Sequence, residues 1–311
     1  MKNKLNQTKC APTKKYKDGS CFTLESLQNI AISYNKRNPK KKIEINLNKT
    51  KLVKELEERL NNKCNEQTCW LKLDFIKAMK NEDVDENTFR PEGPDGKFDW
   101  LSTTNINDVL QQYEDKFPNF VFLGAVPLDF DNLPVLGISN LDLNDLIKHG
   151  KTHIGLVINH DEHWKNGSHW VGLFIDINKN GIYYFDSVGK PPLKLIKNFI
   201  TRIVKYMYSN KYNEKLPVNN IIKIIKQLNN ISKDKLDILM NKKKYLNRLV
   251  NNFDIKYNSI QHQFDNSECG VYSINFILNM AENQEFDDVV NNIKKDKEMN
   301  ENRKIFFRNV N

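Results

Sequence analysis

The sequence predicts an α+β protein, in which a helical N-terminal part precedes a core of strands and helices. Three observations predict this class. Apolar residues recur at helical spacing near both ends of the chain, for example in residues 23–34 and 271–278. β-Branched and aromatic residues instead form short continuous runs, typical of buried strands, from residue 120 onward. A segment rich in proline and glycine, residues 90–96, separates the two parts.

The N-terminal part, residues 1–90, is expected to form a helical arm domain. Its helix-patterned segments are residues 23–34, 52–60 and 70–79. In the first of these segments the spacing predicts four inward-facing side chains: Leu24, Leu27, Ile30 and Ala31. We expect the arm to dock a substrate or a partner protein.

Four of the five cysteines lie in this arm: Cys10, Cys21, Cys64 and Cys69. The ten and four residues between the members of the two pairs are not a standard zinc-ligand spacing. The first six residues lack the apolar stretch of a signal peptide, which favours a reducing compartment, where disulfides are rare. We therefore expect neither a metal site nor disulfides, but small buried anchors of the arm.

The second part, residues 91–311, is expected to be the catalytic domain. Its predicted helices are residues 105–113, 142–148 and 193–208. Its predicted strands are residues 120–123, 152–159, 169–177, 182–187 and 253–259. Residues 213–250 are polar, lysine-rich and helix-patterned, and they are expected to form a surface insertion.

Two of these strands are expected to form a hairpin. The connection between residues 169–177 and 182–187 contains Asn180-Gly181, an Asn-Gly pair of the kind that favours tight antiparallel turns. An antiparallel pair brings the start of its first strand near the end of its second. His169 and Asp186 are therefore expected to be neighbours.

Cys269 is the candidate nucleophile, because it stands at the start of the apolar helix-like run 271–278. A helix N-terminus favours the thiolate, which is the nucleophilic form of cysteine. Gln263, six residues upstream, is placed to donate an amide N–H to a developing oxyanion. The alternative is a small buried cysteine that only packs.

A nucleophilic cysteine needs a base, which is usually a histidine. His169 is our candidate, because it opens a buried strand and so can reach a cleft. His160 and His163 flank two acidic residues, but no further metal ligand follows at a useful spacing. All histidines except His169 are expected to be surface residues or satisfied core residues: His149, His153, His160, His163 and His262.

Together these segments resemble a known family. The motifs are GSHWV at residues 167–171, YFDS at 184–187 and QFDNSECGVY at 263–272. In this order they are similar to cysteine peptidases of the SUMO-protease type, above all to the branch encoded by large DNA viruses such as African swine fever virus and the giant viruses. The similarity covers most of the chain, including the N-terminal cysteines and the tail at residues 296–307.

The resemblance implies a papain-like, adenain-like protease core, with a mixed central sheet flanked by helices. It implies that His169 is the base, Asp186 the group that orients it, Gln263 the oxyanion donor and Cys269 the nucleophile. We expect no metal and no cofactor, and the need for a DNA or peptide activator is left open.

The resemblance also gives two tryptophans a role in substrate binding. Trp100 and Trp170 match residues that, in this family, flank a narrow channel for a Gly-Gly tail and exclude residues with a Cβ. The alternative is two core aromatics. Ser102-Thr103 follows where cellular members have Asn-Asp, which argues against recognition of a folded ubiquitin-like protein.

The charge balance leaves room for one further partner. The chain has 48 lysines and arginines against 39 acidic residues, a net charge of +9, with lysine clusters at 14–15, 40–42 and 242–244. Such clusters are usually solvated faces, but they also permit non-specific contact with DNA. No apolar run approaches the roughly 18 residues that would span a bilayer, so no membrane association is expected.

The function predicted is that of a viral cysteine endopeptidase. It would cut structural or core precursor proteins after small residues, at Gly-Gly-Xaa-like sites, during virion maturation in the virion and the host cytoplasm (viral factory). One alternative is a deSUMOylase or deubiquitinase that acts on host conjugates. Another is a non-enzymatic scaffold that binds ubiquitin-like tails. Its signature would be the loss of Cys269, His169 or Gln263, and all three are present.

Overall fold

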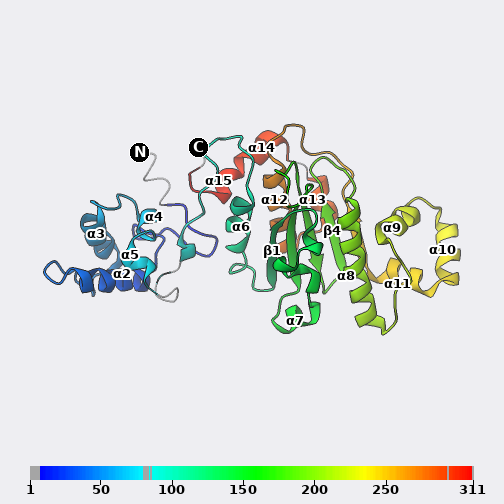
Figure 1. Ribbon diagram of the computed structural model, residues 1–311, viewed down its shortest axis with the longest axis horizontal. Helices are drawn as coiled ribbons and strands as arrows, with labels where there is room; N and C mark the ends of the chain where they lie inside the picture. The colour runs from blue at the N-terminus through cyan, green and yellow to red at the C-terminus, as the bar shows by residue number, and fades with distance from the viewer. Residues whose placement is uncertain (1–7, 80–83, 85, 293, 310–311) are drawn as a thin grey trace. The chain divides into compact units, whose positions relative to one another are not determined.

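The computed structural model describes residues 8–79, 84, 86–292 and 294–309 (Figure 1). The expectation about the first six residues lies outside these ranges. The chain divides into two compact units: Met1–Lys97 with Arg303–Asn311, and Phe98–Asn302. The division expected from the sequence, at residue 90, assigns the linker and the last nine residues to the catalytic part instead.

The first unit is helical, with α2 (Leu24–Arg37), α3 (Lys49–Leu60), α4 (Gln67–Trp70), α5 (Asp74–Lys77), η1 (Glu86–Thr88) and α15 (Arg303–Phe306). Thr23 caps α2 by accepting a hydrogen bond from the backbone N–H of Ser26. Leu27, Ile30 and Ala31 are buried as predicted. Leu24 is 40% exposed, so its prediction was wrong: periodicity does not show where along a helix the covering elements end.

The single helix predicted at residues 70–79 was also wrong. The structure has the short helices α4 and α5 there, separated by a turn. The backbone N–H of Leu73 donates to the carbonyl of Trp70, which is three residues back rather than four, and Leu73 itself is extended. An extended residue ends the helical hydrogen-bond ladder, although the apolar spacing continues across it.

The expectation that the arm contains no disulfides was wrong. Cys10 is bonded to Cys21 and Cys64 to Cys69, with Cα–Cα distances of 5.4 and 5.6 Å that suit a disulfide. The prediction relied on an expected reducing compartment. The short distances between the paired cysteines arise only when the chain folds. The four bonded sulfurs are not available as thiolate ligands for zinc.

The second unit is built on a five-stranded sheet in the order β1-β2-β3-β4-β5. The strands are β1 (Phe120–Val126), β2 (His153–Asn159), β3 (Trp170–Asp176), β4 (Gly181–Phe185) and β5 (Asp254–Tyr257). The two outer pairs, β1–β2 and β4–β5, are parallel, and the two inner pairs are antiparallel. The predicted α+β class with a mixed central sheet flanked by helices is confirmed.

Helices cover both faces of this sheet (Figure 1). On one face, α12 (Cys269–Ala281) packs against β2 and β3, and α6 (Thr103–Gln111) packs against β1. Gly172 permits the close approach of α12, because a Cβ there would lie 2.5 Å from the ring of Phe276. On the other face lies α8 (Lys194–Tyr212), whose buried side chains share a core with those of the strands. The smaller helices are η2 (Phe130–Asn132), η3 (Pro134–Leu136), η4 (Ile138–Asn140), α7 (Leu143–Lys148), α13 (Phe286–Asn291) and α14 (Asp296–Glu301).

The segment 213–250, expected as a surface insertion, has two sides. It contains α9 (Ile221–Asn229) and α10 (Lys233–Lys242), and most of α11 (Lys244–Asn252). Ile221, Ile222 and Leu249 belong to the buried core that also contains residues of α8. In contrast, α10 has no buried residue. None of the helices in the described residues is long and apolar enough to cross a membrane.

Candidate active site

The β3–β4 hairpin brings His169 to Asp186. The register pairs Gly172 with Phe185, so His169 lies just before β3 and Asp186 just after β4. The Nε2 atom of His169 lies 2.7 Å from Oδ1 of Asp186. The Asp186 side chain is fully buried, whereas that of His169 is 16% exposed. The imidazole therefore contacts a buried carboxylate, while part of its own ring remains accessible to solvent.

Asp186 is held in place by its backbone as well as by its side chain. Its N–H donates to Oδ1 of Asn258, and its carbonyl accepts from Nδ2 of the same residue, both at 2.8 Å. The N–H of Val188 donates to Oδ1 of Asp186 at 2.9 Å. Asn258, which is 2% exposed, thus positions the carboxylate. Sequence reasoning missed it, because the bond spans 72 residues.

Cys269 is the first residue of α12 and is buried with a free thiol. It lies close enough to His169 to help raise the pKa of that ring. Because Nε2 of the ring faces Asp186, Nδ1 is the nitrogen left for the sulfur. The first-turn N–H groups of a helix have no intrahelical acceptor, so the sulfur stands beside free donors and the positive end of the helix dipole.

The pKa of His169 reflects opposing effects. Burial lowers the pKa, but the hydrogen bond to Asp186 and the negative charges of Asp186 and Cys269 outweigh burial and raise it to about 9. The ring is then an imidazolium at neutral pH. The imidazolium therefore places a positive charge near the sulfur of Cys269.

A second histidine lies against the first. The ring of His160 meets that of His169 edge to face, with centroids 4.9 Å apart, and its Nε2 lies 3.5 Å from the hydroxyl of Tyr184. Burial and the positive charge of His169 lower the pKa of His160 to about 4, so this ring is neutral near pH 7. It therefore packs on His169 without adding a competing charge. His160 directly follows β2, opposite the start of β3, and this position in the sequence could have predicted its contact with His169.

Gln263 has a fixed carboxamide. The hydroxyl of Ser187 donates to its Oε1 at 2.7 Å, and its Nε2 donates to the carbonyl of Asp265 at 2.6 Å. One of the two hydrogens on Nε2 remains for another acceptor. The backbone N–H groups of Phe264 and Asp265 donate to Oδ2 of Asp296 at 2.8 and 3.0 Å, which holds this loop. Neither Ser187 nor Asp296 was predicted to belong to the site.

The two candidate substrate-binding tryptophans differ in exposure. Trp170 is buried, and its indole Nε1 donates to the carbonyl of Leu101 at 2.9 Å. Leu101 packs beside Gly270, where an added Cβ would lie 3.0 Å from the Cβ of Leu101. Trp100 precedes Leu101 and is 48% exposed, so it is not a core aromatic. The strip Trp100-Leu101 is therefore fixed beside the helical turn that begins at Cys269.

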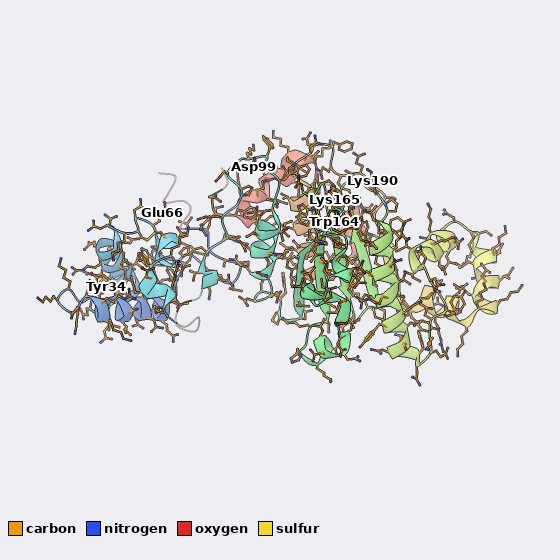
Figure 2. The ribbon with its side chains drawn as sticks, in the orientation of Figure 1. Tyr34, Glu66, Asp99, Trp164, Lys165 and Lys190 are labelled. Carbon is orange, nitrogen blue, oxygen red and sulfur yellow. A yellow bond between two sulfur atoms is a disulfide. The ribbon has the colours of Figure 1, made fainter. Side chains whose placement is uncertain are left out.

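The remaining histidines lie outside this group of contacts. His163 makes a 2.6 Å contact from Nδ1 to Asp129. It is followed by Trp164 and Lys165, both marked in Figure 2, and Trp164 is 66% exposed. His153 is buried beside Asp176, and His149 lies at the exposed end of α7. His262 is buried between aromatic rings, and burial lowers its pKa.

The chain is similar to proteases from large DNA viruses. It is 32% identical over 319 residues to R355 of Acanthamoeba polyphaga mimivirus, which carries the name of a thiol protease, and the match covers 96% of this chain and 93% of R355. It is 23% identical over 283 residues to the SUMO-1 cysteine protease S273R of African swine fever virus, covering 83% and 89% of the two chains.

The fold is similar to that of a solved protease. The crystal structure of the African swine fever virus pS273R protease matches with a TM-score of 0.59 and 19% identity, over 97% of this chain and 96% of that one. Residues 151–310 match the model of the Ulp1 protease family, C-terminal catalytic domain. With these matches, the chain belongs to the Ulp1 family of cysteine proteases.

Proposed function

We propose that this chain is a cysteine endopeptidase with Cys269 as nucleophile, His169 as base, Asp186 as orienting group and Gln263 as oxyanion donor. The observation that carries the proposal is the position of the His169 ring, which is hydrogen-bonded to buried Asp186 through Nε2 and lies within electrostatic reach of the free thiol of Cys269. A nucleophile, its base and a group that orients the base are the parts that acyl transfer needs.

The reaction proceeds through an acyl-enzyme. The thiolate of Cys269 attacks the scissile carbonyl carbon, and its oxygen becomes an oxyanion that accepts hydrogen bonds from Nε2 of Gln263 and the backbone N–H of Cys269. The C–N bond then breaks, while the imidazolium of His169 donates its proton to the leaving amine. Neutral His169 next deprotonates a water, which attacks the thioester and releases the carboxylic acid product and the thiolate.

The proposed substrates are structural or core precursor proteins, cut after small residues at Gly-Gly-Xaa-like sites during virion maturation. Trp100 supports this, because it is exposed beside the turn that begins at Cys269, and Trp170 supports it by fixing Leu101. An indole wall favours residues without a Cβ. The viral relatives support action in the virion and the host cytoplasm.

A second candidate activity is the cleavage of ubiquitin-like conjugates. The name of the African swine fever virus relative, SUMO-1 cysteine protease, favours it. For either activity we propose that the N-terminal arm, residues 1–90, docks the substrate or a partner. The net charge of +9 supports additional non-specific contact with DNA.

The test compares three substrates side by side: a peptide with a Gly-Gly-Xaa site, a virion precursor protein and a SUMO conjugate. The purified protein is expected to cut the peptide and the precursor after Gly-Gly, whereas Cys269→Ala cuts none of the three. Cleavage of the SUMO conjugate alone would replace the first candidate by the second. Cleavage by Cys269→Ala at the wild-type rate would overturn the assignment of the nucleophile.

A further inference from the structure

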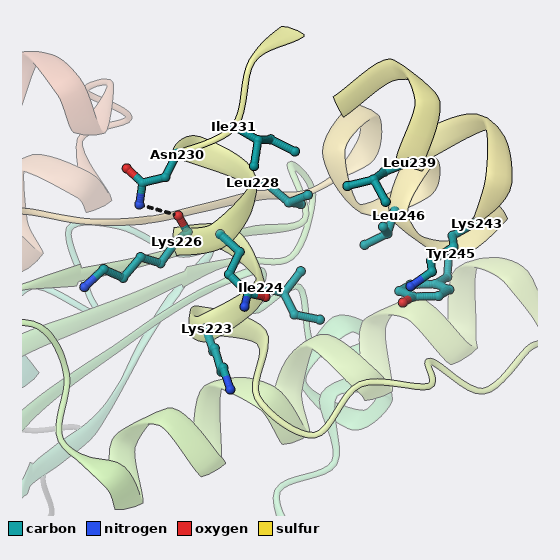
Figure 3. A pocket seen from close by; sticks show the side chains of 11 residues that line it. Lys223, Ile224, Lys226, Leu228, Asn230, Ile231, Leu239, Lys243, Tyr245 and Leu246 are labelled. Atoms are coloured by element: carbon teal, nitrogen blue, oxygen red, sulfur yellow. Dashed lines mark hydrogen bonds between the residues drawn. The ribbon is translucent and has the colours of Figure 1, made fainter. Parts of the chain in front are cut away.

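Helices α9, α10 and α11 line a hollow that is open to solvent. The proposed catalytic mechanism does not use this hollow. Its volume is about 650 Å³, within the roughly 300–1,000 Å³ of ligand pockets. Figure 3 shows Leu228 and Ile231 on one side of the hollow, facing Leu239 and Leu246 on the other. This hollow, called the insertion hollow below, has room for a few side chains.

Part of the apolar wall of the insertion hollow stays accessible to solvent at Ile231 and Leu239, although Leu228 and Leu246 are buried. Leu239 belongs to α10, a helix without a single buried residue, and Ile238 beside it is 53% exposed. Ile231 is only half-buried. Aliphatic side chains that stay exposed to solvent on a folded protein mark an interaction site when they are grouped around a concave surface.

The rim of the insertion hollow is positively charged. Lys223, Lys226 and Lys243 line it, and no acidic side chain does so. In the described part of the chain, none of these three ammonium groups has an ion-pair partner, whereas neighbouring Lys244 is paired with Glu214. Residues 213–250 hold nine lysines and arginines against three acidic residues, a net of +6 within a chain of net +9.

We propose that the insertion hollow binds an acidic amphipathic peptide segment of a partner protein. The apolar side chains of that segment would enter between Leu228 and Leu239, and its carboxylates would meet the three rim lysines. A helix laid into an apolar groove is a recurring mode of peptide recognition, and complementary rim charges speed the encounter and fix the orientation.

Two other occupants fit the lining less well. Single-stranded nucleic acids are held by cations with aromatic stacking platforms, but Tyr245 is the one aromatic among the residues that line the hollow. Membrane surfaces attract amphipathic helices that carry their apolar and basic residues outward, whereas the leucines here face one another across a concavity. Binding of nucleic acid and binding of membrane vesicles are both tested in the experiment below.

The probe is a fluorescein-labelled 14-residue peptide with leucines at helical spacing and glutamates elsewhere. Its binding to full-length protein is measured by fluorescence polarisation in a Cys269→Ala background, so that the peptide is not cut. One comparison peptide has lysines in place of the glutamates, and another has the same composition in scrambled order. The acidic amphipathic peptide alone is expected to bind.

Two variants of equal charge change locate the binding. Lys223→Glu with Lys226→Glu is expected to weaken the peptide roughly tenfold, since several complementary charges are reversed. Lys233→Glu with Lys235→Glu, on α10 but outside the lining, is expected to weaken it less than about twofold, the size typical of a screened surface charge. Leu239→Asp, at a half-buried site, tests the apolar wall and should abolish binding.

Circular dichroism and melting curves check that each variant is folded. Equal losses in the two lysine variants would overturn the proposal, since binding would then be non-specific. Tight binding of a 12-base-pair DNA or of phosphatidylserine vesicles that depends on Lys223 and Lys226, with no binding of the acidic peptide, would also overturn it. Because the readout is binding, its failure is independent of the proposed catalytic residues.

Discussion

At the residue scale, the charge state of His169 controls the proposed chemistry. Its pKa is raised to about 9, well above the value of about 6.5 for a free imidazole, so the protonated ring is stabilised in the folded protein. That stabilisation is complete below pH about 6.5 and is lost as the pH rises through about 9. We expect kcat/KM on a Gly-Gly-Xaa peptide to fall on the alkaline side near pH 9.

Asp186→Asn should move this alkaline limb to lower pH, because the neutral amide no longer favours the imidazolium. Activity at neutral pH should survive in part, since an amide oxygen can still accept a hydrogen bond from Nε2 of His169. The pH profile of kcat/KM, measured for both proteins, checks the shift. An unchanged limb would show that Asp186 does not set the pKa of His169.

The positions of Ser187 and Gln263 lead to a third prediction. Gln263→Ala should reduce turnover roughly a hundredfold or more, since loss of one oxyanion donor costs about 2.7–4 kcal/mol. Ser187→Ala should reduce it less, about tenfold, because it frees the carboxamide without removing it. Neither change should slow alkylation of Cys269 by iodoacetamide, which forms no oxyanion.

Ser209→Ala, exposed on α8, is the control for these kinetics. If Gln263→Ala slows alkylation as strongly as peptide cleavage, the glutamine supports the structure and is not an oxyanion donor. If Ser187→Ala leaves turnover at the wild-type value, the 2.7 Å bond does not position the amide.

The sequence predicts the candidate site where each residue has a local signal. Cys269 starts a helical run, and the short connection of the β3–β4 hairpin brings His169 to Asp186. Asn258 and Asp296 act through contacts with segments 72 and about 30 residues away, and no local pattern marks such a contact. They become visible only when the chain is folded.

At the element scale, the N-terminal turn of α12 is packed against the strip that carries Trp100. Gly270 allows this, because a Cβ there would lie 3.0 Å from the Cβ of Leu101. Gly270→Ala should push Leu101 and Trp100 away from Cys269. We expect KM for a Gly-Gly-Xaa peptide to rise and kcat/KM to fall about tenfold, since tight overpacking costs roughly 1–3 kcal/mol.

Leu101→Ala in the Gly270→Ala background provides the control. If the clash is the cause, the smaller side chain should relieve it, and the double variant should be more active than the product of the two single effects predicts. Additive effects would mean that Gly270 acts on Cys269 through the helix and not through Leu101. Alkylation rates of Cys269 separate these two routes.

Predictions of helices and strands succeed where the residues that determine the element lie close together in the sequence. The β3–β4 hairpin was predicted, although its turn is residues 177–180 and Gly181 already belongs to β4, and the burial of Leu27 and Ile30 follows from helical spacing. The break between α4 and α5 does not follow, because the apolar spacing runs on through the extended Leu73. The parallel pairing of β4 with β5 depends on a long connection through α8 to α11, which periodicity cannot align.

At the scale of the whole molecule, the sulfur chemistry is divided between the two units. Both disulfides lie in Met1–Lys97, and the free thiol of Cys269 lies in Phe98–Asn302. The proposed catalytic groups all belong to the second unit as well. The oxidation state of the two disulfides and the catalytic activity are therefore expected to vary independently.

The last prediction concerns the disulfides. Cys10→Ser with Cys21→Ser should destabilise the first unit by about 3 kcal/mol, and Cys64→Ser with Cys69→Ser by about 2 kcal/mol, because the second pair closes a shorter loop. Denaturant unfolding measures both changes. Turnover of a short peptide should stay at the wild-type value in both variants, since the peptide needs only the groups around Cys269. Mass spectrometry of unreduced native protein should find one alkylated cysteine, and five after reduction in denaturant. Labelling of all five in the native protein would show that the disulfides do not form, and loss of peptide turnover in either serine variant would show that the first unit contributes to the active site.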